Sequence, residues 1–303
     1  MPGDIKVATQ RDPTLNRIEA LAHRRSETDR RMGYGWMIIP LLPVAAVIII
    51  GAVFVGIILS IIPRIGNLSQ QTTTTAQSAI EPVVGGILAL YGLSIIVFFA
   101  VMFFGALSFY YMIDRRNRHF GRQQLLFSGI HRYLASKAPR SETISQLGDI
   151  AEDSGLAEGT RPAGLWALLF MFVAPIVGLI ASYNLTHDMR KHDELQSKYQ
   201  ATLVPSLAEA GFQDPNFQGY KTHNRDPVLF VILTAITGGL FWIYWYYTLL
   251  KDYNDHFMEH AKFEEQLLKT LIPTPPQKTC GTCGGKVPAT AKFCPSCGRQ
   301  QTG

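Results

Sequence analysis

Residues 33–63 read GYGWMIIPLLPVAAVIIIGAVFVGIILSIIP and contain no charged side chain. A helix needs about 20 mostly apolar residues to cross the hydrocarbon core of a bilayer. This run is longer than that, and it follows an arm, residues 1–32, that carries seven Lys and Arg residues. The apolar region of a secretory signal peptide is shorter. We therefore expect the run to remain in the protein as a membrane span.

Three further segments of the chain are apolar and uncharged over most of their length. They lie within residues 82–113, 162–185 and 227–250, and the last contains the aromatic cluster FWIYWYY at 241–247, which suits a membrane–water interface. Only 17% of the residues are charged, against roughly 25% in soluble domains. The sequence predicts an all-α polytopic membrane protein with about four transmembrane helices, at about 36–62, 84–113, 163–185 and 227–250.

The basic residues of the connecting segments predict the topology. Lys and Arg concentrate in cytoplasmic loops, and residues 114–161 carry eight of them whereas residues 64–81 carry one. This asymmetry places the arm 1–32 and the loop 114–161 in the cytoplasm and, with four spans, both termini as well. We interpret the basic loop as a topology signal and a phospholipid contact rather than a nucleic-acid surface.

The loop 186–225 fits this topology poorly, because it should be external and yet carries five basic residues. Span three could instead be a re-entrant hairpin that turns at Pro175. That arrangement would move the cysteine-rich tail to an oxidising side, where free thiolates fare poorly. We therefore expect four full spans in the cell membrane.

All four cysteines of the chain lie near its end, in two C-x-x-C pairs separated by ten residues: Cys280, Cys283, Cys294 and Cys297. Two such pairs supply the four soft donors of a tetrahedral zinc site, which is closed to substrate and therefore structural. A redox dithiol and an iron–sulfur centre are the alternatives. Gly284 and Gly298 follow the pairs, and Val287 with Phe293 could form a small apolar plug. So small a unit has almost no core, so we expect one zinc ion to supply its folding energy.

The run from Ala291 to Gly298, AKFCPSCG, resembles the short zinc-ribbon family found at the ends of many prokaryotic proteins. The resemblance covers residues 280–298 and implies a β-knuckle fold around Zn²⁺. A proline-rich linker, 273–279, precedes it, and Pro-rich segments are extended spacers. An amphipathic helix at 251–272 precedes the linker. The ribbon and this helix are the segments through which we expect a protein partner, or another copy of the chain, to bind.

The sequence also contains an internal repeat. A shift of 137 residues aligns Asn117-x-His119-Phe120 with Asn254-x-His256-Phe257, and a shift of 64 aligns His192 with His256. The Tyr/Trp-rich span that leads into KDYNDH at 251–256 resembles a family of uncharacterised prokaryotic membrane domains, over residues 160–270. That resemblance implies no activity. In a four-span topology the middle copy faces the opposite side from the other two, which is a conflict.

Two histidine clusters are candidate metal or proton sites. His256 and His260 share one face of a helix, but they provide only two ligands, with Glu259 and Asp252 as speculative additions. A second cluster, His187 to Asp193, follows span three. We interpret both as solvated helix faces.

No catalytic motif is present, so we expect a non-enzymatic membrane protein whose cytoplasmic ribbon binds or senses a partner. A small transporter or channel is the first alternative, with Gly85-Gly86 and Gly238-Gly239 as candidate helix breaks. The spans lack ionisable residues at mid-depth, where ion-coupled transporters usually place them. A membrane enzyme that uses the histidine clusters is the second alternative.

Overall fold

The computed structural model describes residues 12–67, 73–212, 217, 224–272, 277–288 and 291–300. Most of these residues are helical, so the predicted all-α class is confirmed. Within these ranges three helices, rather than the expected four, are long and apolar enough to cross a membrane. The elements are α1 (Pro13–His23), α2 (Arg25–Thr28), η1 (Tyr34–Met37), α3 (Ile38–Asn67), α4 (Thr73–Lys137), α5 (Glu142–Ala157), α6 (Ala163–Glu209), α7 (Pro227–Ile236), α8 (Phe241–Leu271), β1 (Gln277–Thr279) and β2 (Lys286–Pro288).

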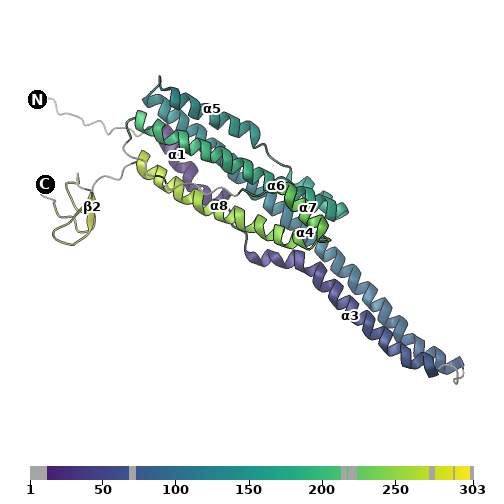
Figure 1. Cartoon of the computed structure of the whole chain (residues 1–303). Coiled ribbons are helices and arrows are strands. Elements are labelled where there is room, and N and C mark those ends of the chain that lie inside the picture. Colours follow the sequence, from purple (N-terminus) through teal and green to yellow (C-terminus); the bar gives the residue numbers. More distant parts are fainter. Residues whose placement is uncertain are drawn as a thin grey trace, which may run out of the picture.

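Helices α3 and α4 form a long hairpin that projects from the rest of the helices (Figure 1). Its side chains are apolar and face outward: Ile48, Leu88 and Phe99 are each more than half exposed. Large exposed apolar surfaces belong in lipid or in an interface rather than in water. This hairpin contains the predicted spans 36–62 and 84–113, and both lie in helices that qualify as membrane-spanning.

The segment expected to be the third span folds back on itself. Val173 has non-helical backbone angles, φ −137° and ψ 50°, two residues before Pro175, which cannot donate a helical hydrogen bond. Arg161 donates to both carboxylate oxygens of Asp188, at 2.6 and 2.8 Å. A straight helix would separate residues 27 positions apart by about 40 Å. Residues 163–172 therefore form one arm of a hairpin, and the rest of α6 forms the other.

The segment expected to be the fourth span, 227–250, is also a hairpin and not one helix. α7 ends at Ile236 and α8 begins at Phe241, and between them Gly238 and Gly239 have φ of 59° and 94°. Positive φ is accessible to glycine at little cost. Arg225 donates to both carboxylate oxygens of Asp252, which is also 27 positions away in the sequence. The two ends of the segment therefore lie together.

The aromatic cluster 241–247 lies along the returning arm of this second hairpin, where part of it forms the core. Trp245 and Tyr246 are fully buried. The indole N–H of Trp245 donates to the hydroxyl of Thr186 at 2.8 Å, and Tyr246 contacts Ser108. The prediction of an interfacial belt is therefore wrong for these two residues, because packing between helices provides their polar atoms with partners.

A helical bundle stands where the sequence predicted a basic loop at 114–161. α4 continues without a break to Lys137, and α5 returns beside it. The second arm of α6 and α8 run parallel to α4, and the expected amphipathic helix 251–272 is the buried end of α8 (Figure 1). The described part of the predicted arm 1–32 is also packed: α1 buries Ile18 against the bundle. Apolar residues of α1, α4, α5, α6 and α8 share one core, which periodicity alone does not reveal.

The cysteine module, residues 277–300, contains a short antiparallel pair of strands. Lys278 of β1 lies opposite Val287 of β2. β1 occupies residues 277–279, which were expected to belong to the linker, and the prolines at 273–276 lie outside the described residues.

The turn between α7 and α8 gives a direct test of this fold. A Gly239→Ala substitution places a Cβ at φ 94°, where side chains are strained although no atom lies within 4 Å. We expect a loss of roughly 1–2 kcal/mol in the free energy of unfolding, measured by denaturant titration in mild detergent. The control is Gly92→Ala in α4, which also meets open space but is helical, and which should be neutral or stabilising. Equal effects of the two substitutions would contradict the turn geometry.

Candidate metal centres

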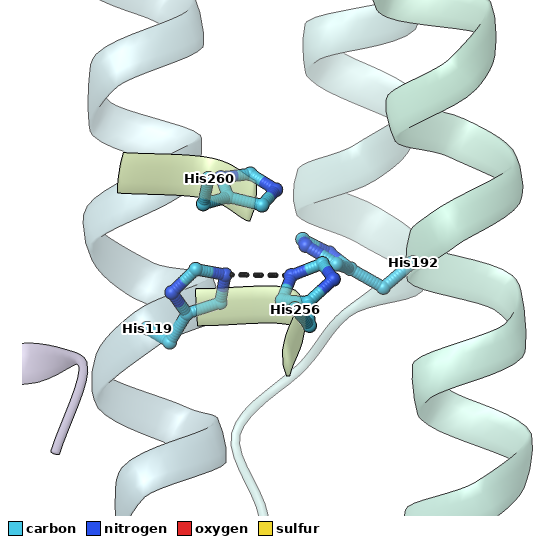
Figure 2. A group of neighbouring side chains, drawn as sticks. All are labelled: His119, His192, His256 and His260. Carbon is cyan, nitrogen blue, oxygen red and sulfur yellow. Dashed lines mark hydrogen bonds between the residues drawn. The ribbon is translucent and has the colours of Figure 1, made fainter. Parts of the chain in front are cut away.

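Four histidines meet inside the bundle, just beyond the apolar part of α4. Figure 2 shows their rings turned toward one another, with His119 on α4, His192 on α6, and His256 and His260 on α8. All four are buried, and one nitrogen from each ring lies within 4.8 Å of those of the others. Nε2 of His119 and Nε2 of His256 are 3.1 Å apart.

A carboxylate stands behind each of these rings. Asp29 lies 3.0 Å from Nδ1 of His119, Glu158 lies 2.7 Å from Nδ1 of His192, and Asp193 lies 2.9 Å from Nδ1 of His256. Glu264 is more distant, at 4.0 Å from Nδ1 of His260. A carboxylate on one ring nitrogen fixes the tautomer and turns the other nitrogen toward a metal. For the first three histidines, this leaves Nε2 as the nitrogen that faces the centre.

The same contacts recur from helix to helix around the centre. The residues that follow His119, His192 and His256 each contact the histidine of a neighbouring helix. Phe120 stacks on His192 at 4.2 Å, and Phe257 packs on His119 at 4.6 Å between ring centroids. Asp193 does the same to His256 through its carboxylate. The three parallel helices thus surround the centre as three copies of one unit.

Two equivalent asparagines hold the chain segments that supply the carboxylates. The side chain of Asn117 accepts from the backbone N–H of Arg161 and donates to its carbonyl, at 3.0 and 2.6 Å. Asn254 makes the same two bonds with Met32, at 3.0 and 2.8 Å. Glu158 precedes Arg161 by three residues, and Asp29 precedes Met32 by three residues. The repeat therefore positions ligands and their supporting carboxylates together.

Arg122 is the cation that contacts two of these carboxylates. Its guanidinium lies 2.8 Å from Asp29 and 2.7 Å from Glu264. Burial would raise the pKa of Asp29, but His119 and Arg122 more than offset this, and its pKa lies below the usual range. Burial raises the pKa of Glu264 to about 7, although Arg122 opposes the shift. Arg122 therefore pairs with two of the four carboxylates, whereas Glu158 and Asp193 contact histidines.

The histidines themselves are poorly placed to supply positive charge as imidazolium ions. Burial, followed by the neighbouring histidines, lowers the pKa of His260 well below its ordinary value. The Nε2 atoms of His119 and His256 face each other, so both cannot carry a proton there. Neutral imidazoles are the form that binds metal.

The donor set fits a transition-metal ion. Imidazole nitrogens suit zinc, copper, iron and nickel, whereas magnesium and calcium require oxygen ligands. The buried Nε2 of His192 has no hydrogen-bond partner among the described residues, and a buried polar atom of this kind needs one. Nitrogens on a tetrahedral zinc ion are about 3.3 Å apart, so side-chain rotations that move each nitrogen by about 1 Å would bring all four to bonding distance of one ion.

This centre unites both histidine clusters that the sequence had suggested, and it corrects their interpretation as solvated faces. His256, His260 and His192 belong to it, whereas Asp252 pairs with Arg225 and His187 is half exposed. The sequence did not identify His119 as a ligand. The signal was present in the repeat, because the shifts of 137 and 64 residues align His119 and His192 with His256.

The four cysteines also converge, as predicted, and form a group that could hold a metal ion. Sγ of Cys280 lies 3.8 Å from that of Cys297, and Sγ of Cys283 lies 3.6 Å from that of Cys294. Gly284 and Gly298 have the expected positive φ, 70° and 69°.

The apolar plug of this module is smaller than predicted. Val287 is fully buried, whereas Phe293 is 59% exposed. Buried apolar area is therefore minimal, so the four sulfurs remain the main means of holding the module together.

Comparison of the chain with family models, with curated proteins and with solved structures finds no match. The chemistry of both centres therefore follows from their own geometry.

The charge network behind the histidines predicts a large effect of a single substitution. Arg122→Met removes the buried guanidinium between Asp29 and Glu264, and we expect a loss of about 3–5 kcal/mol in the free energy of unfolding of metal-free protein. The control is Arg118→Met on the same helix, whose pair with Asp114 is partly exposed. It should cost about 1 kcal/mol or less. Denaturant titration in detergent measures both, and similar losses would show that the buried network contributes little.

Proposed function

We propose that the protein is a membrane-anchored metal-binding protein whose bundle holds one first-row transition-metal ion between His119, His192, His256 and His260. The observation that carries this proposal is the meeting of four buried imidazoles, each with a carboxylate behind it. Arg122 contacts Asp29 and Glu264, and positive charge at the centre would stabilise the carboxylates behind the other histidines, because buried charge is costly unless it is compensated. A divalent cation at the centre supplies it.

The proposed protein is non-enzymatic. Four nitrogen ligands complete a tetrahedral shell, and catalytic metal sites keep a position open for water or substrate. The centre is also enclosed on all sides by helices, and each of its histidines is at most 1% exposed. Such a site suits structural, sensing or electron-transfer roles.

The cysteine module, in this proposal, is a zinc ribbon that holds one structural Zn²⁺ and binds a protein partner. The support is the four-sulfur group on two C-x-x-C turns, the two glycines with positive φ and the proline-rich sequence that joins the module to α8. Such a linker holds a small domain at a distance. Its exposed Phe293 offers an apolar contact.

Metal analysis tests the two centres separately. Purified protein reconstituted with zinc should carry two ions per chain, one for each group. The double variant His119→Ala/His192→Ala should lose one ion, because two of four ligands on two helices are removed. Cys280→Ser/Cys283→Ser should lose the other. The matched control, His131→Ala/His187→Ala, alters the same two helices outside the centre and should keep both ions.

Cobalt substitution adds a second measurement that does not depend on the histidine variant folding. Cys280→Ser/Cys283→Ser should still bind one cobalt ion and show a tetrahedral visible spectrum without thiolate charge-transfer absorption. The histidine centre would be excluded if this variant bound no cobalt, or if His119→Ala/His192→Ala kept two zinc ions.

Crosslinking tests the role of the ribbon. Cys294→Ser/Cys297→Ser should remove those protein partners that crosslink to wild-type protein in membranes, because the module loses the metal that folds it. The histidine double variant should keep them if the ribbon alone makes the contact. A set of partners that is unchanged when the module is lost would contradict the interaction role.

A further inference from the structure

Both short hairpins, formed by residues 163–188 and by α7 with the start of α8, end in large apolar side chains that face outward. At the first turn Phe172 is 77% exposed, and at the second Ile236 is 76% exposed. Leu168 and Ile176 beside the first turn, and Leu240 at the second, are each more than half exposed. In water this surface would be costly, at roughly 25 cal/mol per Å² of apolar area.

The open ends of all three hairpins, opposite their turns, lie at the same height along the bundle. Arg161 with Asp188 closes the first short hairpin, and Arg225 with Asp252 closes the second. At the same height, Asn117 donates a hydrogen bond to the carbonyl of Arg161, at the start of the first short hairpin. Asn254 donates to the carbonyl of Met32, which precedes α3. Charged and polar side chains therefore form a girdle from which every apolar hairpin extends.

The arms of the hairpins differ in length by more than twofold. The first arm of α6, residues 163–172, and α7 each have ten residues, which span about 15 Å. The apolar helix Tyr34–Ser60 has 27 residues and spans about 40 Å. The hydrocarbon core of a bilayer is about 30 Å thick. The long hairpin therefore crosses it, and the short ones reach its middle.

The second turn is built to lie in lipid, where every backbone N–H must find a partner within the protein. Gly238 and Gly239 donate to the carbonyls of Ala235 and Thr234, at 3.2 and 2.8 Å. The N–H of Phe241 donates to the hydroxyl of Thr237 at 2.9 Å. The backbone N–H groups at 238, 239 and 241 are thus satisfied without water.

We propose that only the α3–α4 hairpin crosses the membrane and that the two short hairpins are inserted among the acyl chains of a single leaflet, from the side that carries the bundle. This topology goes beyond the metal-binding function and does not depend on it. It places the repeated histidine segments on one side, which removes the conflict between the repeat and four full spans.

The basic residues support the same arrangement and identify the side. The eight Lys and Arg residues of 114–161 then lie on the same side of the membrane as Arg190, Lys191, Lys198 and Arg225, the side that carries the bundle. Positive loops are cytoplasmic, so the bundle, the histidine centre and the cysteine module are cytoplasmic. The cysteines remain on a reducing side even though span three is re-entrant, because the fourth segment is re-entrant as well.

Labelling of single introduced cysteines in sealed vesicles of both orientations tests the topology, with a membrane-impermeant maleimide and mass spectrometry to locate the label. Leu156→Cys on α5 and Glu194→Cys on α6 occupy exposed positions and should label from the same side. Asn67→Cys, at the far end of α3, should label from the opposite side. Phe172→Cys and Ile236→Cys, at the two turns, should be protected from both sides.

Each alternative topology gives a different result. Labelling of Glu194→Cys from the side of Asn67→Cys would establish four full spans and overturn the proposal. Labelling of Phe172→Cys or Ile236→Cys from either side would show that the turns do not end within the leaflet, and would overturn it too. The metal content of these variants reports the histidine centre independently, so the two proposals fail separately.

Discussion

Burying a carboxylate costs several kcal/mol unless a positive charge and hydrogen bonds accompany it, and this chain buries four around four imidazoles. Asp29, Glu158, Asp193 and Glu264 come from four different segments. Arg122 pairs with Asp29 and Glu264, whereas Glu158 and Asp193 contact histidines. The N-terminal segment, the end of α5, α6 and α8 each contribute one of these carboxylates, so the layer links all of them around the histidines.

The layer is organised by repetition. Helices that are copies of one unit present equivalent residues at equivalent heights when they pack side by side. A histidine repeated on three helices therefore becomes a three-membered ring of histidines, to which α8 adds His260 one turn further along. The asparagines at 117 and 254 repeat in the same way, and each holds the segment whose carboxylate supports a histidine. Duplication thus supplies a candidate metal centre from a motif that offers a single histidine.

The membrane part follows from the same layer. The two short units leave the polar level, turn at exposed apolar residues and return. Pro175 and Gly238-Gly239 are the positions that permit the short turns, since one lacks a donor and the others accept positive φ. The first unit has long apolar stretches in both α3 and α4, and each is long enough to cross a bilayer.

The sequence by itself determined the local features. Long uncharged runs identified the apolar segments, and the first two of them lie in helices long enough to cross a membrane, because apolar length is read directly from composition. Two C-x-x-C pairs specified the cysteine group, because a metal site made of tight turns is local in sequence. The repeat aligned His119, His192 and His256 as equivalent positions of three segments.

Only the tertiary structure decided what these features do together. Hydropathy does not distinguish one span of 24 apolar residues from a hairpin with two arms of about ten, since both have the same apolar composition. The ion pairs of Arg161 with Asp188 and of Arg225 with Asp252 show that the chain forms hairpins. Histidines separated by 73 and 64 residues become neighbours only through helix packing, which is a long-range effect that no local pattern encodes.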